Sequence, residues 1–188
     1  MEVYPIMDLE KIAEMKKVLE GRRERGRDIL LLVMGINTAL RIGDLLALSV
    51  GHVLDNEGKI AQALELREQK TGKTKRFPIN ESLKEALLDY LAERQGCDHS
   101  EPLFLSQKGG TLGRVQAWRI ISEAGESVGL SNIGAHSLRK TFGYHVYKKN
   151  GDIGLVQKLL NHSASRITLR YIGIDRERMD RAYLELNL

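Results

Sequence analysis

The sequence predicts a mainly helical α+β domain that carries one small antiparallel β-hairpin. Two observations lead to this fold class. Apolar residues recur at helical spacing through most of the 188 residues, but the period changes to that of β-strands at residues 60–79. No internal repeat or low-complexity linker interrupts the pattern, so we expect residues 1–188 to form a single domain.

The first part of the chain predicts three helices in succession. Asp8 is a good N-cap for a helix that ends at Gly21. The apolar run ILLLVMGI indicates a buried helix at about residues 27–38 and is too short to span a bilayer. The segment RIGDLLAL starts the third helix, with Gly43 as a weak N-cap. Between the first two helices, the basic run at residues 22–27 is interpreted as a solvated helix end.

Two short strands follow, and then the helical period returns. The strands are IAQALEL and KRFPI, joined around KTGK at residues 70–73. The GKT within this turn is not a phosphate-binding P-loop, because that motif needs glycine at position 67, which is Arg67, and a helix after the loop. The later helices are expected at about residues 81–95, 113–128, 136–149, 152–161 and 175–186.

Composition narrows the functional classes only slightly. The chain has 29 Lys and Arg against 25 Asp and Glu, a net charge of +4, which allows a polyanionic partner without requiring one. Cys97 is the one cysteine and cannot form an internal disulfide, so a cytoplasmic setting fits. The first residues lack the layout of a signal peptide. His136, His145 and His162 lack the short spacing of metal ligands, so no metal site is expected.

Several residues suited to phosphate chemistry occur in a fixed order. Arg41 and Asp44 are separated by one helical turn, as are His136 and Arg139, and each pair alone is most simply a surface pair or a structural side chain. Taken together, the order of these residues along the chain suggests that they form one site. The candidates in chain order are Arg41, Lys70, His136, Arg139, His162 and Tyr171.

Four sequence boxes around these residues resemble the tyrosine recombinase family, the integrases of phages and mobile elements. The boxes TALRIGDLLAL, KTGKTKRFP, HSLRKTF and LNHSASRITLRY are similar to the family patterns T-G-x-R-I-x-[ED]-L, K-x-x-K-x-R-x-x-P, H-x-L-R-[KH]-[ST]-[FA] and L-G-H-x-x-x-x-x-T-x-x-Y. They occur in the family's order across nearly the whole chain. The resemblance implies the recombinase catalytic-domain fold and site-specific cleavage and rejoining of double-stranded DNA.

The resemblance also assigns a role to each candidate. Tyr171 would attack a backbone phosphate to form a 3′-phosphotyrosyl intermediate, without metal, ATP or another cofactor. Lys70 would protonate the leaving 5′ oxygen, and Asp44 would orient Arg41 or His136. His136 would accept a hydrogen bond or proton near the nucleophile, and His162 would hydrogen-bond a non-bridging oxygen. The guanidiniums would neutralise the phosphate and lower the pKa of the phenol. The DNA backbone contacts implied are Lys73, Lys75, Arg76 and Lys140.

The chain departs from the family pattern in places. Asn161 stands where the family usually has glycine, but asparagine also tolerates the left-handed conformation of a helix end. Asp44 replaces the commoner glutamate. The N-terminal DNA-binding domain of most relatives is absent, so the chain is either a fragment or a short, complete recombinase.

Further expectations concern assembly and the alternatives. By resemblance, the chain would act as a homotetramer on DNA, with the apolar stripe of the tail, residues 175–188, docked on its own domain or on a neighbour. The alternative function is a non-catalytic DNA-binding regulator with the same fold. A type IB topoisomerase is the third possibility, against which the compact length argues.

Overall fold

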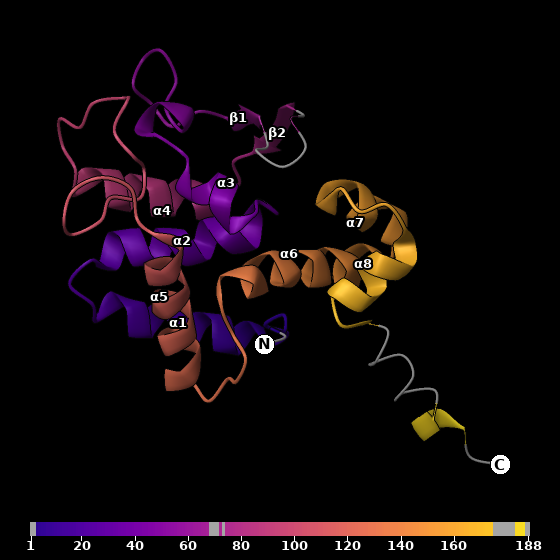
Figure 1. The fold of residues 1–188 in the computed structure, drawn as a ribbon. Helices are drawn as coiled ribbons and strands as arrows, with labels where there is room; N and C mark the ends of the chain where they lie inside the picture. The colour runs from indigo at the N-terminus through magenta and orange to yellow at the C-terminus, as the bar shows by residue number, and fades with distance from the viewer. Residues whose placement is uncertain (1–2, 68–71, 73, 175–182, 187–188) are drawn as a thin grey trace.

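The computed structural model describes residues 3–67, 72, 74–174 and 183–186 and confirms a mainly helical fold with one two-stranded antiparallel sheet (Figure 1). None of the helices in these ranges is long and apolar enough to cross a membrane. The elements are α1 (Leu9–Glu20), α2 (Arg25–Asn37), α3 (Ile42–Leu46), the 3-10 helix η1 (Val50–His52), β1 (Ala63–Arg67), β2 (Thr74–Pro78), α4 (Glu81–Ala92), α5 (Arg114–Ser127), α6 (Ala135–Asn150), α7 (Ile153–Leu160) and α8 (Ser165–Tyr171).

The larger of two hydrophobic clusters among the described residues, here called the main core, is built around α2. This helix packs against α1, α4, α5 and α6, and its side chains from Leu30 to Met34 are almost completely buried. The prediction of a buried helix here is therefore confirmed. Gly35 lies where α6 crosses, and Leu138 occupies the space that a side chain at this position would need. The absence of a side chain at Gly35 thus lets α6 lie directly on α2.

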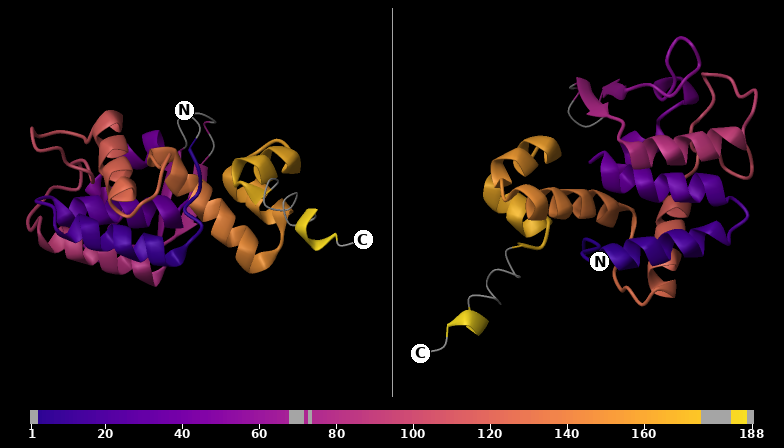
Figure 2. Two further views of the ribbon diagram at one scale, coloured as in Figure 1. Left: turned by 90° about the horizontal axis from the view of Figure 1, so that it is seen from below. Right: turned by 180° about the vertical axis from the view of Figure 1, so that it is seen from behind.

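A smaller cluster, here called the second core, lies at the C-terminal half of α6. Figures 1 and 2 show α7 and α8 against this half of α6, to one side of the main body. A Cβ at Gly143 would lie 2.8 Å from Ile172 and 3.0 Å from Leu160, so glycine allows this close packing. The buried members of the second core are Ala39, Tyr144, Val156, Leu160, Ile172 and Ile174.

The β-hairpin forms close to the predicted positions. β1 and β2 pair antiparallel with Leu64 opposite Phe77, and Leu64 and Leu66 are buried in the main core. Alternation along β1 explains this burial, because successive side chains of a strand point to opposite faces. The residues between the strands, including Lys70 and Lys73, lie outside the described part of the chain, and only the backbone of Lys75 is described.

One local prediction was wrong, helix α8 was missed, and one predicted helix lies largely outside the described residues. Gly43 is not an N-cap, because α3 already begins at Ile42 and Arg41 occupies the cap position in an extended conformation. Helix α8 was not predicted, since seven residues with little apolar periodicity give a weak signal. Of the predicted helix at 175–186, residues 175–182 lie outside the described ranges, while residues 183–185 are helical.

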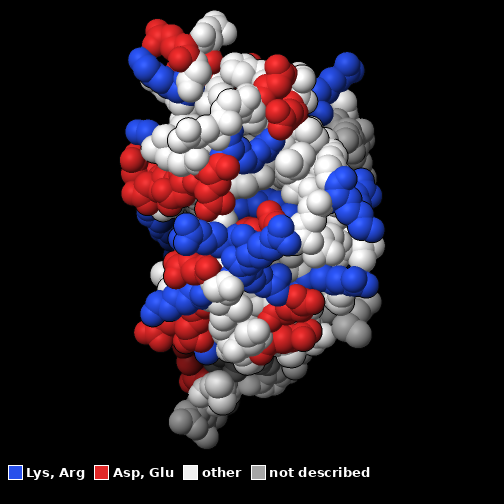
Figure 3. Space-filling view, turned by 90° about the vertical axis from the view of Figure 1, so that its left-hand side faces the viewer, with Lys and Arg blue, Asp and Glu red and all other residues white. Residues whose placement is uncertain are grey.

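The basic run at residues 22–27 is not wholly solvated. Arg27 is 4% exposed and donates two hydrogen bonds to Asp28 and one, of 2.9 Å, to the carbonyl of Leu105. Arg22 forms ion pairs with Asp28 and Glu123. Figure 3 shows this face of the molecule, where basic and acidic side chains alternate. The run therefore helps to fix α2 to neighbouring segments.

Candidate active site

Arg41 and Asp44 are placed by a sharp turn between α2 and α3. Ala39 adopts a left-handed backbone conformation, with φ of 56°, so that the chain reverses before Arg41 caps the next helix. Arg41 is half-buried, and its positive charge acts on the phenol of Tyr171. Asp44 is buried one turn later. Its predicted orienting role stays a prediction.

His136 and Arg139 lie one turn apart at the start of α6, as predicted. Arg139 is 4% exposed, and its guanidinium donates hydrogen bonds to the carbonyl oxygens of Ala39 and Leu160, the latter at 2.5 Å. These carbonyls belong to the α2–α3 turn and to the end of α7. Arg139 therefore joins three segments and brings Arg41 and the α7–α8 pair to one place.

The end of α7 and the short helix α8 position His162 and Tyr171. Asn161 adopts the left-handed conformation, with φ of 52° and ψ of 48°, and ends α7 as expected. His162 Nδ1 lies 3.2 Å from Thr168 Oγ1, and its ring meets that of Tyr171 edge to face, with the centroids 4.8 Å apart. Tyr171 is the last residue of α8. The structure thus brings Arg41, Arg139, His162 and Tyr171 together.

The acidity of Tyr171 reflects two opposing effects. Burial raises the pKa of the phenol above its ordinary value, while the charge and a hydrogen bond of Arg139 and the charge of Arg41 act in the opposite direction. The two arginines therefore lower the pKa, as predicted, but burial, which the sequence did not indicate, has the larger effect. Removal from water is the larger effect because it disfavours the phenolate.

The surroundings of His136 favour its neutral form. The ring presents part of its surface to solvent, yet partial burial, followed by the charges of Arg139, Lys140 and Arg114, lowers the pKa of His136 below its usual range. A neutral imidazole can accept a proton, as the proposed chemistry requires. Among the described residues, no three His, Cys, Asp or Glu side chains are grouped as metal ligands.

Arg114 is a basic residue near the site that the sequence did not indicate. It is the first residue of α5, and its guanidinium lies 2.7 Å from the position that a Cβ on Gly43 would take. Together with Trp118 and His136 it lines a pocket of about 760 Å³. Nothing in the spacing of the sequence links α5 with α3, so only the folded chain reveals this neighbour.

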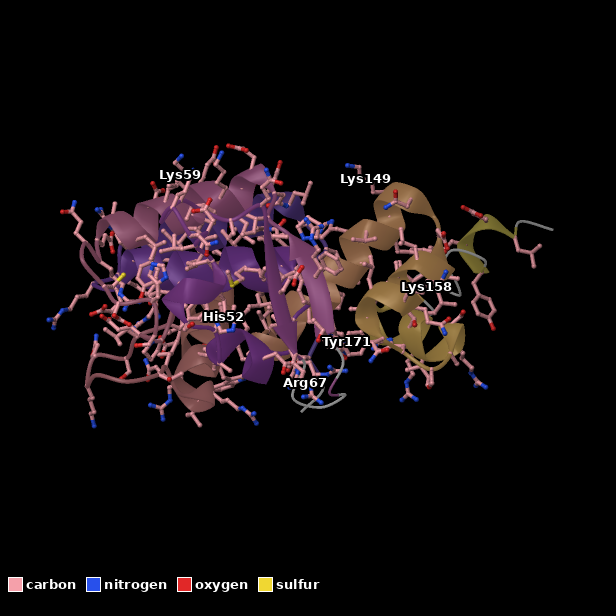
Figure 4. The ribbon with its side chains drawn as sticks, turned by 90° about the horizontal axis from the view of Figure 1, so that it is seen from above. His52, Lys59, Arg67, Lys149, Lys158 and Tyr171 are labelled. Atoms are coloured by element: carbon pink, nitrogen blue, oxygen red, sulfur yellow. The ribbon has the colours of Figure 1, made fainter. Side chains whose placement is uncertain are left out.

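The predicted DNA contacts are found in different settings. Arg76 is exposed on β2, 3.9 Å from Glu65, so its predicted role stays open. Lys140 instead donates a 2.8 Å hydrogen bond to the carbonyl of Val3. In the view of Figure 4, Tyr171 lies between the end of β1, labelled at Arg67, and the α7–α8 pair. The position of Lys70 in this arrangement is outside the described residues.

Comparison with known proteins agrees with this geometry. The profile of the phage integrase family matches residues 6–178. A probable integrase/recombinase of Bacillus subtilis, YoeC, is 43% identical over 182 residues, which cover 96% of this chain and 95% of YoeC.

Two solved structures share the fold. The crystal structure of XerA recombinase superposes with a TM-score of 0.73 at 22% identity, over all of this chain and 65% of XerA. The post-cleavage complex of XerH recombinase with its difH substrate gives 0.73 at 21% identity, over 97% of this chain and 53% of XerH. This chain thus spans only part of these two longer proteins. From the family match and the close relative, the chain is a member of the phage integrase family.

Proposed function

We propose that the chain is a site-specific recombinase that breaks and rejoins DNA strands through Tyr171. The observation that carries the proposal is the meeting of this phenol with Arg41, Arg139 and His162. Tyr171 Oη attacks a backbone phosphorus, the Oη–P bond forms, and the bond from phosphorus to the 5′ oxygen breaks. The 3′ end is then esterified to the enzyme, and a free 5′ hydroxyl is released.

Each proton in this step has a proposed carrier. Lys70 protonates the departing 5′ oxygen, and His136, whose lowered pKa favours the neutral imidazole, takes up the phenolic proton. In the reverse step, a 5′ hydroxyl of the partner strand attacks the ester and releases Tyr171. Because the ester retains the energy of the phosphodiester, the exchange needs no ATP.

Fixed positive charge stabilises the transition state. Arg41 and Arg139 remain protonated at any working pH and can donate paired hydrogen bonds to phosphate oxygens. His162 donates to another non-bridging oxygen. Preorganised donors of this kind supply the stabilisation that a bound cation gives other phosphoryl-transfer enzymes, so we propose a reaction independent of metal.

The proposed partner is double-stranded DNA, bound by a homotetramer. XerH, which shares the fold, is described in complex with its DNA substrate. Lys73, Lys75 and Arg76 on the hairpin would contact the DNA backbone, and residues 175–188 would connect protomers. Exposure of Tyr183 and Leu186, at 83% and 67%, is consistent with a tail that can contact a neighbour. Residues 1–188 would act as one catalytic domain.

The proposal is tested by covalent trapping on a nicked duplex that contains the recombination site. Wild-type protein should become linked to the DNA 3′ end, also in excess chelator, and Tyr171→Phe should bind the duplex without becoming linked. Phenylalanine removes one oxygen only, so the fold should survive. A covalent complex formed by Tyr171→Phe would contradict the proposal. Binding without linkage by the wild type would indicate the non-catalytic regulator instead.

A further inference from the structure

The first described residues, 3–7, form a segment that is bound along α6, here called the N-terminal strap. The amide of Tyr4 donates to the carbonyl of Asn132 at 3.1 Å, and the amide of Ile6 donates to Thr141 Oγ1 at 2.8 Å. Ile6 is buried, and its carbonyl oxygen lies 3.0 Å from His145 Nε2. The strap is therefore fixed to the loop before α6 through Tyr4 and to α6 itself, the helix that carries Arg139, through Ile6.

The strap also contacts the active site at two points. At one point the carbonyl of Val3 accepts the 2.8 Å hydrogen bond from Lys140 Nζ. At the other, Gly173 has φ of 78°, and the position of a Cβ there lies 3.4 Å from Met7 Cε and 3.7 Å from Pro5 Cγ. Gly173 follows Tyr171 by two residues. The strap thus lies against both Lys140 and the turn after the nucleophile.

Lys140 in turn contacts the nucleophile itself. Its ammonium lies 5.1 Å from the centroid of the Tyr171 ring, within the range of a cation–π interaction. His162 contacts the same ring edge to face. Two side chains therefore hold the ring, one from α6 and one from the end of α7. Because the Val3 carbonyl binds the ammonium, Lys140 has a defined place over the ring.

We propose that Lys140 is a positioning residue for Tyr171 and that the N-terminal strap holds it in place. This inference rests on the proposed function, in which Tyr171 is the nucleophile. It gives Lys140 a role different from the DNA backbone contact that the sequence suggested. A backbone contact would require the ammonium to leave the Val3 carbonyl and the ring, whereas a positioning role uses both contacts as they stand.

The chain offers a matched control on the same helix. Lys148 Nζ lies 5.5 Å from the centroid of Tyr144, the same kind of contact with a tyrosine that is not the nucleophile. Lys140→Gln and Lys148→Gln remove the same charge from α6, so a general effect of charge on DNA binding should appear in both. Lys140→Arg keeps a cation that can lie over the ring and serves as the conservative variant.

The first measurement is single-turnover formation of the covalent complex at saturating nicked DNA, together with the salt dependence of the dissociation constant. Lys140→Gln should slow covalent formation about 10- to 100-fold, because small misplacements of a reacting group have effects of this size. Its affinity and salt dependence should match those of Lys148→Gln, and Lys140→Arg should recover most of the rate. The proposal would be overturned if Lys140→Gln formed the covalent complex at the normal rate on saturating DNA while the slope of log affinity against log salt fell by about one. That result would show that Lys140 contacts a phosphate.

A second measurement needs no DNA and so separates this inference from the proposed function. With ¹³C-labelled tyrosine, the ring signal of Tyr171 is identified among the six tyrosines by its absence in Tyr171→Phe. Lys140→Gln should shift this signal and speed rotation of the ring, while Lys148→Gln should affect only the Tyr144 signal. An unchanged Tyr171 signal in Lys140→Gln would overturn the inference, whatever the protein does to DNA. Failure of the wild type to form a covalent complex would instead remove the proposed function.

Discussion

The main core and the second core each support part of the active site, but they differ greatly in size. Arg41 and His136 lie on elements packed into the main core, which includes side chains from α1 to α6. His162 and Tyr171 rest on the second core, which has six buried members in the described part of the chain. Each large aliphatic side chain buried there contributes about 1.5–3 kcal/mol, so the loss of one is a large share of that region's stability.

This difference separates the two tasks of the site. Arg41 and His136 depend on the larger cluster and Tyr171 on the smaller one, which we expect to open locally at a lower free energy because fewer buried side chains hold it. Arg139 connects the two, because it follows Leu138 of the main core on α6 and its guanidinium donates hydrogen bonds to the carbonyls of Ala39 and Leu160, which belong to the second core. The predictions below test this division.

The largest effect is expected from Arg139→Ala. It removes a charge next to the phosphate and leaves the carbonyls of Ala39 and Leu160 without their donor. Covalent complex formation should fall on the order of 10³-fold. Stability, measured by urea denaturation, should fall by about 2–5 kcal/mol, because each buried acceptor left unsatisfied costs about 1–3 kcal/mol. Arg139→Lys should recover little, since an ammonium lacks the planar fork. Wild-type stability in the alanine variant would show that the two cores are not joined through this side chain.

The loss of Lys70 should affect chemistry without affecting stability, because its proposed role is only to protonate the leaving oxygen. Lys70→Ala should slow cleavage of ordinary DNA about 10²-fold, as expected for a general acid. A substrate with sulfur at the 5′ bridging position should restore the rate, because thiols have pKa values near 8.5 and leave without protonation. Arg139→Ala is the control and should not be rescued. Equal rescue of both variants would remove the acid role from Lys70.

Gly143→Ala tests the second core directly. The added methyl would meet Ile172 and Leu160 at 2.8 and 3.0 Å, so we expect a loss of about 1–3 kcal/mol. Hydrogen exchange should speed up in α7 and α8 and stay unchanged in α2. Gly21→Ala, which meets only one backbone oxygen at 3.5 Å, is the matched control. Faster exchange in α2 to the same extent would indicate a single cooperative unit.

The smallest effect on stability is expected from His136→Gln. The folded-state pKa of His136 is lowered, so as pH falls through the ordinary value of about 6.5 the unfolded chain takes up a proton first, and stability decreases. His136→Gln should lose this part of the acid destabilisation, which melting curves between about pH 5 and 8 would reveal. The apparent pKa on the acid side of the pH profile of kcat/KM should likewise lie below the ordinary histidine value of about 6.5. An apparent pKa above that value would contradict a neutral His136 in the free protein.

The sequence predicted those features of the site that depend on neighbouring residues. One helical turn separates His136 from Arg139, and the preference of asparagine for the left-handed conformation explains the end of α7 at Asn161. The short boxes therefore sufficed to predict where on their helices these residues lie. The buried helix α2 and the hairpin were predicted for the same reason, because hydrophobic period is a local property.

Features that depend on packing between distant segments were not predictable. Arg114 approaches Gly43 only after α5 has packed beside α3. Val3 contacts Lys140 although most of the chain separates the two residues in sequence. The net direction of the pKa shift of Tyr171 could not be predicted either, because charge can be read from a sequence but burial of one phenol cannot. In each case the missing quantity was a distance set by the whole fold.

Ala39 has a further consequence, for engineering. The related sequence pattern has glycine at this position, whereas here a residue with a Cβ takes the left-handed conformation, which costs roughly 1 kcal/mol for an L-residue. The same residue supplies the carbonyl that Arg139 binds and a methyl group buried in the second core. Replacement by glycine would relieve the strain but also free the backbone that aims this carbonyl. At this turn, a substitution that raises stability by removing backbone strain is therefore expected to lower the catalytic rate.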